Sequence, residues 1–324
     1  MFKTRITECL GIEYPILLGP MLWISKAELV AAVSNAGGLG ILVGLCSPTP
    51  EELREEIKRI RGMTDKPFAV NITLLPTARP IDYEAYFSAA VAEGVNIVET
   101  SGRSPEPYMK LLKDAKVTVL HRAARIRDIK TAERVGVDAV SILGFEAAGH
   151  PGMEDVSSFV RIPIAVDAVE IPVIAAGGIG DARGLVAALA LGAEGVLIGT
   201  RFMASRESPV HKNIKEWLLE LGEADTMMIQ RSIKNATRVI RTEHSQRILE
   251  MEEKGATLEE LLPLISGERG RAAYESGDAS EATVTCGQVV GLIHEIPSVK
   301  EIIDDMVSGA RQIAQRLHKI GIDS

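Results

Sequence analysis

The chain has 324 residues, of which 46% are hydrophobic and 25% are charged. This composition is ordinary for a globular protein, and the length suits one α/β barrel with an appendage. The net charge of −8 argues against nucleic acid or an anionic membrane as a general partner, because both attract basic surfaces. A local basic pocket for a phosphate remains compatible with this charge.

The cysteines and the N-terminus indicate a compartment. Cys9, Cys46 and Cys286 are far apart in sequence, so we expect no redox pair and no metal site. The first fifteen residues lack the apolar core of a signal peptide, and Gly, Pro or charge interrupts every apolar run before membrane-spanning length. We therefore expect a cytoplasmic protein that contacts no membrane.

Eight short, continuously apolar runs alternate with helical patterns, as is typical of parallel strands covered on both faces. The runs are 15–19, 39–43, 67–73, 95–100, 117–121, 138–143, 171–178 and 195–200. Their number predicts an α/β fold, a (β/α)8 TIM barrel, with an open doubly wound sheet as the alternative. Between them, Ser25, Thr49 with Pro50, and Asp181 are expected to cap helices.

The alternation stops near residue 205. From 209 to about 273 the apolar spacing predicts helices alone, and the last segment predicts another amphipathic helix. We therefore expect a helical appendage near the C-terminus of the barrel. The predicted division is a barrel over 1–207, a helical extension over 208–287 and a C-terminal helix over 288–324 that packs back on the barrel.

Small residues follow the last two predicted strands, where TIM barrels commonly bind phosphate. Ala176, Gly177 and Gly178 end the seventh run, and Gly199 and Thr200 end the eighth. Glycine lets backbone N–H groups approach a ligand closely, and a helix N-terminus favours an anion. The pattern predicts a phosphate site, with two ordinary strand-to-helix turns as the alternative.

Three residues at the ends of the first and third runs suit a flat polar ring such as flavin. Asn71 and Thr73 would offer hydrogen bonds at the barrel mouth, and Met21 would give an apolar wall. Loop capping by Asn71 and core packing by Met21 are the alternatives.

The segment GFEAAGHPG, residues 144–152, surrounds His150 with small residues after the sixth run. A histidine at the barrel mouth can take or give a proton near neutral pH. Glu146 either orients the ring or faces solvent. Beside a bound cofactor, His150 is the candidate catalytic residue, and a surface histidine in a turn is the alternative.

The same segment resembles the GxEAGGHxG signature of the nitronate monooxygenase (2-nitropropane dioxygenase) flavoproteins. PILLGPM at 15–21, the stretch 171–202 and RSIKNATRV at 231–239 are also similar to that family. With FAVNITLLPT at 68–77, the likeness covers nearly the whole chain and is closest to a bacterial branch that includes NADH:quinone reductases.

The resemblance implies an FMN-dependent oxidoreductase whose barrel binds FMN and needs no metal. It implies that the FMN phosphate lies on Gly177, Gly178, Gly199 and Thr200. The ring would lie near Met21, Asn71 and Thr73, with Ala148 and Gly149 along its edge.

The sequence departs from that branch around the ring. A lysine that reaches the flavin in relatives is Arg122 here, which keeps the charge and changes the donor geometry. Leu143 stands where an acidic residue is expected, and residues 19–24 read GPMLWI where branch members tend to have Gly-Gly-Met-Gln-Trp. These departures leave the exact reaction open.

The first expectation from the resemblance is nitronate monooxygenase. FMN would take an electron from an alkyl nitronate, O2 would complete its conversion to a carbonyl compound and nitrite, and His150 would act as the base. The alternative is an NADH:quinone oxidoreductase, in which Pro76 and the LLPT loop border the nicotinamide. Further alternatives are an enoyl-acyl-carrier-protein reductase, a non-catalytic flavin-binding protein and a flavin-free phosphosugar isomerase. A homodimer is compatible with each.

Overall fold

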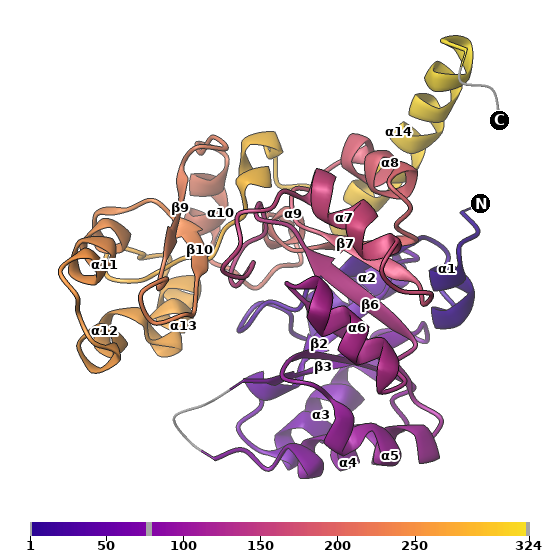
Figure 1. Ribbon diagram of the computed structural model, residues 1–324, viewed down its shortest axis with the longest axis horizontal. Coiled ribbons are helices and arrows are strands. Elements are labelled where there is room, and N and C mark those ends of the chain that lie inside the picture. The colour runs from indigo at the N-terminus through magenta and orange to yellow at the C-terminus, as the bar shows by residue number, and fades with distance from the viewer. Residues whose placement is uncertain (1, 76–79, 322–324) are drawn as a thin grey trace.

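The computed structural model describes residues 2–75 and 80–321, and Figure 1 shows how their helices and strands are arranged. Its eight parallel strands follow the order β1-β8-β7-β6-β5-β4-β3-β2. The Leu18 N–H donates to Leu39 O at 2.9 Å and the Leu39 N–H donates to Ile16 O at 3.0 Å, which joins β1 to β2. The predicted TIM barrel is confirmed. The strands are β1 (Ile16–Leu18), β2 (Gly40–Val43), β3 (Phe68–Leu74), β4 (Ile97–Gly102), β5 (Thr118–Ala123), β6 (Ala139–Leu143), β7 (Val173–Ala176) and β8 (Gly195–Ile198).

Helices cover the outside of these strands. They are α2 (Ala27–Asn35), α3 (Pro50–Arg61), α4 (Tyr83–Ala92), α5 (Glu106–Asp114), α6 (Ile126–Arg134), α7 (Ser158–Val166), α8 (Ala182–Ala190) and the short α9 (Thr200–Met203); the 3-10 turn η1 (Gly44–Cys46) precedes α3. Thr49 and Asp181 cap α3 and α8 as predicted. The prediction for Ser25 is wrong, because its hydroxyl instead accepts from the Met21 N–H and donates to Gly19 O.

The floor of the barrel is apolar. Alternate strand residues point inward, and Leu17, Ile41 and Leu120 are among those that form one buried cluster. Ile6 and Leu10 of α1 (Arg5–Leu10) belong to the same cluster, so this helix closes the amino-terminal end of the barrel. Any ligand site inside the barrel therefore belongs at the opposite, carboxyl end.

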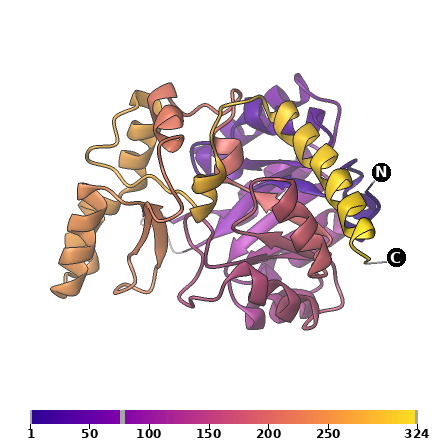
Figure 2. The same ribbon diagram turned by 90° about the horizontal axis from the view of Figure 1, so that it is seen from above.

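The appendage lies on one side of the barrel in both views (Figures 1 and 2). It was predicted to be helical throughout, and this is wrong for two segments. β9 (Thr226–Ile229) and β10 (Thr237–Ile240) pair antiparallel, with Thr237 opposite Ile229. Thr237 and Val239 are β-branched residues two positions apart on β10, and such residues favour a strand. The spacing of the apolar residues in this segment had instead indicated a helix. The helices of the appendage are α10 (Lys212–Leu218), α11 (Glu243–Glu253), α12 (Leu258–Ile265) and α13 (Gly267–Ser276).

The chain returns to the barrel through a 3-10 turn and a long helix. The turn is η2 (Gln288–Leu292), and the helix α14 (Val299–Lys319) begins later than position 288, where the C-terminal part was expected to start. Met306 of α14 is buried, and α14 packs against α8, where a Cβ on Gly309 would lie 2.6 Å from the Ala182 Cβ. The division at 207 and 287 stays a prediction. Across the described part of the chain, no helix has the length and apolar character needed to cross a membrane.

Candidate active site

One pocket lies at the carboxyl ends of β1, β6, β7 and β8. It brings together eight of the predicted site residues, namely Met21, Arg122, Ala148, Ala176, Gly177, Gly178, Gly199 and Thr200. Asn71, Thr73, Gly149 and His150 are not among its lining residues. Gly149 and His150 directly follow Ala148 in the chain, while Asn71 and Thr73 lie on β3.

The glycines after β7 form a concave turn of backbone. Gly177 has φ +100° and Gly178 has φ +73°, the left-handed region that side chains disfavour. A Cβ on Gly177 would lie 3.1 Å from Ala147 N. Among the described residues, the Gly178 N–H has no hydrogen-bond partner. Successive N–H groups in such a turn form an anion-binding concavity, so the backbone here fits the phosphate of FMN.

Thr200 and the returning segment close another wall of the pocket. The Thr200 Oγ1 accepts a hydrogen bond from the Gly287 N–H at 3.1 Å, which ties the returning segment to the start of α9. A Cβ on Gly287 would lie 2.9 Å from Glu146 O, and the Gln288 N–H donates to the same oxygen at 3.0 Å. Sequence reasoning missed Thr285, Gly287 and Val289, which all line the pocket. Gly287, within the mostly apolar stretch 284–293, was the available signal.

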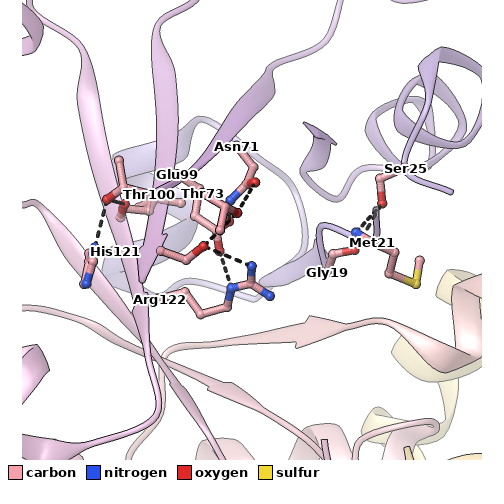
Figure 3. Close-up of polar contacts among 11 residues, drawn as sticks. Gly19, Met21, Ser25, Asn71, Thr73, Glu99, Thr100, His121 and Arg122 are labelled. Carbon is pink, nitrogen blue, oxygen red and sulfur yellow. Dashed lines mark hydrogen bonds and ion pairs between the residues drawn. The ribbon is translucent and has the colours of Figure 1, made fainter. Parts of the chain in front are cut away.

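A buried polar cluster links β3 to β4 (Figure 3). The Asn71 Nδ2 donates to Glu99 Oε2 at 2.5 Å, and the Thr73 hydroxyl donates to Asn71 Oδ1 at 3.0 Å. Thr73 also shares a 3.0 Å hydrogen bond with Ser101. Asn71 and Thr73 therefore belong to this cluster, and one N–H of the Asn71 amide has no partner among these contacts. Their predicted hydrogen bonds to a flavin ring stay a prediction.

Glu99 joins this cluster to Arg122 on β5. The Arg122 Nε lies 3.4 Å from Glu99 Oε1, and Glu99 is fully buried. Burial raises the pKa of Glu99, while the Arg122 charge and the hydrogen bond from Asn71 oppose this shift. Sequence reasoning missed Glu99. The available signal was an acidic residue inside an apolar strand, in register with Asn71.

The GFEAAGHPG loop is held by the hairpin of the appendage. The Gly149 N–H donates to Arg238 O at 3.1 Å, and the Arg238 N–H donates back to Gly149 O at 2.6 Å. The Arg238 guanidinium lies 4.3 Å from the Phe145 ring centre and donates from Nη2 to Phe145 O at 2.9 Å. The motifs at 144–152 and 231–239, which are distant in sequence, therefore bind each other in the structure.

His150 stands at the edge of this loop. Surrounding protein, and to a lesser extent the positive charge of Arg122, lowers the pKa of His150 from 6.5 to about 4. The side chain is nevertheless exposed, so water screens part of the effect while its direction holds. The lowered pKa favours the neutral imidazole at pH 7. Glu146 does not orient it, because this carboxylate accepts hydrogen bonds from the N–H and hydroxyl of Ser158.

Comparison with known proteins shows the family to which this chain belongs. A model of the nitronate monooxygenase family matches residues 3–309. The chain belongs to the nitronate monooxygenase family. As a member it is an FMN-dependent oxidoreductase.

Three relatives cover almost the whole chain. FabK from Thermotoga maritima is 38% identical to this chain and has a TM-score of 0.92. The match covers 99% of this chain and 100% of the FabK chain. A nitroalkane oxidase from Streptomyces ansochromogenes is 25% identical, with a TM-score of 0.82 over 97% of this chain and 100% of its own. The (3aS,4S,5R,7aS)-5-hydroxy-7a-methyl-1-oxo-octahydro-1H-indene-4-carboxyl-CoA dehydrogenase of Rhodococcus jostii is 32% identical over 95% of this chain and 96% of its own.

Proposed function

We propose that FMN binds in the pocket at the carboxyl end of the barrel. Gly177, Gly178, Gly199 and Thr200 would hold the phosphate through backbone N–H groups and one hydroxyl. The positive φ values of the two adjacent glycines and the unpartnered Gly178 N–H support this placement. Met21, Arg122, Ala148 and Ala176, which line the same pocket, would contact the ring. When bound, FMN supplies the electron acceptor that the side chains of this pocket lack.

We further propose that the enzyme is a nitronate monooxygenase that also accepts the neutral nitroalkane: it forms the alkyl nitronate by removal of a proton and converts the nitronate, with O2, to a carbonyl compound and nitrite. The observation that carries this proposal is the position of His150: it is exposed and lies two residues after the pocket-lining Ala148, on a loop that the Gly149–Arg238 hydrogen bonds hold in place. The lowered pKa of His150 favours the neutral imidazole. A neutral imidazole can take the proton from the carbon next to a nitro group, which yields the nitronate. Arg122 at the pocket wall favours the binding of an anion.

The role of His150 is tested by His150→Ala in the FMN-loaded enzyme. Nitrite release from a neutral nitroalkane should fall roughly 100-fold or more, because general-base catalysis contributes about that much. The flavin absorbance of the protein should stay unchanged. His294→Ala is a matched control, since His294 is exposed and lies outside the pocket. Turnover that is equal in both variants would remove His150 from the mechanism.

A second candidate is an oxidoreductase that acts on an acyl thioester. The whole-chain relative from Rhodococcus jostii is named as a dehydrogenase of a carboxyl-CoA compound, and this observation favours the candidate. Flavin bleaching by a hydroxyacyl-CoA in the absence of O2, without bleaching by a nitronate, would favour this candidate over the first.

The NADH:quinone reductase also stays a proposal. Pro76 and Thr77, which were expected to border the nicotinamide, lie outside the described residues. Rapid bleaching of the flavin by NADH, followed by its recovery with a quinone, would identify this activity.

A further inference from the structure

A charged pair lies at the base of the pocket wall, above the apolar floor of the barrel. Glu99 has an exposed fraction of 0%, and the Arg122 side chain retains 19%. Within the described chain, neither Glu99 Oε1 nor Arg122 Nε has a hydrogen-bond partner. Their 3.4 Å contact is therefore an electrostatic one.

Stability does not explain why this pair is present. Ile97 on the same strand and Leu120 on β5 are buried in the barrel interior, so apolar side chains fit this space. Two charges removed from water lose solvation, and replacement of a buried ion pair by apolar residues is often neutral or stabilising. The pair must be explained by what it does at the pocket.

The two charges have different access to the pocket. Arg122 lines it together with Gly19 and Met21, and Figure 3 shows its guanidinium on the side of Glu99 that faces these two residues. Glu99 is not a lining residue, so it acts on a ligand by its charge and by its contact with Arg122, without touching the ligand. Because Glu99 is fully buried and the Arg122 side chain is largely buried, the field at the pocket is that of Arg122 reduced by the carboxylate behind it.

Building on the FMN site proposed above, we propose that Glu99 is a positioning residue. It holds the Arg122 guanidinium against β4 and offsets its charge, and thereby sets the reduction potential of the bound flavin. A fully reduced flavin carries more negative charge than an oxidised one, so a cation beside the ring favours reduction and a carboxylate beside that cation opposes it. Asn71, which donates to Glu99 Oε2, holds the carboxylate in place.

The test is the midpoint potential of the bound FMN in Glu99→Gln, measured by anaerobic titration against a reference dye. The amide keeps the shape of the side chain and removes its charge. Arg122 then acts without compensation, and the enzyme should bind reduced FMN at least tenfold more tightly relative to oxidised FMN. For a two-electron couple this is a rise of about 30 mV.

Thr100→Val is the matched control. Thr100 follows Glu99 on β4 but is directed away from the cluster, and its hydroxyl bonds the His121 ring at 2.9 Å. This variant disturbs the same strand without a change of charge, so its potential should equal that of the wild type. A potential that shifts equally in both variants would reduce Glu99 to a packing role and overturn the inference.

The double variant Glu99→Gln with Arg122→Met leaves no unpaired buried charge and covers the case in which Glu99→Gln alone does not fold. We expect the ratio of its affinities for reduced and oxidised FMN to lie within threefold of the wild-type ratio, because a neutral pair replaces the compensated charged pair. If the relative affinity for reduced FMN falls more than tenfold in the double variant, Arg122 acts uncompensated in the wild type, which contradicts the inference.

If the wild type binds FMN and Glu99→Gln leaves its midpoint potential unchanged, only the inference about Glu99 is overturned. A wild type that binds no FMN overturns the cofactor proposal as well.

Discussion

The charge state of His150 decides how turnover depends on pH. Its lowered pKa means that the neutral ring, which is the form that accepts a proton, predominates at pH 7 and is lost only as the pH falls towards the folded-state value. We expect kcat/KM for a neutral nitroalkane to be level near pH 7 and to fall with an inflection below 6.5, the ordinary value of histidine. A pH profile of the wild type checks this. An inflection above 6.5 would contradict a base in this environment.

A substitution at Gly178 tests the proposed phosphate site. Asp at this position would place a carboxylate beside the unpartnered N–H and would adopt the φ of +73° only with strain. We expect Gly178→Asp to lose FMN, seen as loss of flavin absorbance after gel filtration. Gly136→Asp is the control, because Gly136 also has a positive φ and a Cβ there meets no atom within 4 Å. A yellow Gly178→Asp protein would mean that the phosphate binds elsewhere.

Among the secondary-structure elements, the β9–β10 hairpin holds the 144–152 loop at Phe145 and Gly149. Arg238→Met would remove its bonds to Phe145 O and to the Thr226 hydroxyl. Loss of charged hydrogen bonds of this kind costs about 2 kcal/mol. We expect urea unfolding to show this loss and turnover to fall while FMN stays bound, because the loop that carries His150 loses its support.

Arg231→Met is the control for the hairpin. Arg231 pairs with Asp155 near the surface, and such pairs contribute about 0–1 kcal/mol. Its turnover should stay near that of the wild type. If Arg238→Met also keeps full turnover, the hairpin does not position the loop.

Elements differed in how well the sequence predicted them. The barrel followed from eight apolar runs, because strands buried on both faces have a pattern that solvent-exposed elements lack. The hairpin was missed since each strand has four residues, too few to separate a period of two from helical spacing. Thr49 and Asp181 could be read as caps because capping is local. The role of Ser25 depends on how the loop after β1 folds back.

At the scale of the whole molecule, the candidate site is made by segments that are distant in sequence. Position after a barrel strand was enough to bring Gly177 and Gly199 to one pocket, because the fold fixes where strands end. The role of His150, predicted in the same way, stays a prediction. It could not predict Gly287, which reaches the pocket only after the appendage has returned to the barrel. Glu99 was missed for a related reason, since its partner Arg122 comes from the neighbouring strand.

The enzyme as a whole is proposed to bind FMN at the barrel mouth and to oxidise a nitronate there. The measurement that tests this most directly is the visible absorbance of the FMN-loaded protein after anaerobic mixing with a primary alkyl nitronate. We predict rapid bleaching of the oxidised flavin, with recovery of the colour and release of nitrite when O2 is admitted. A spectrum that the nitronate leaves unchanged, in a protein that has bound FMN, would contradict the proposed reaction.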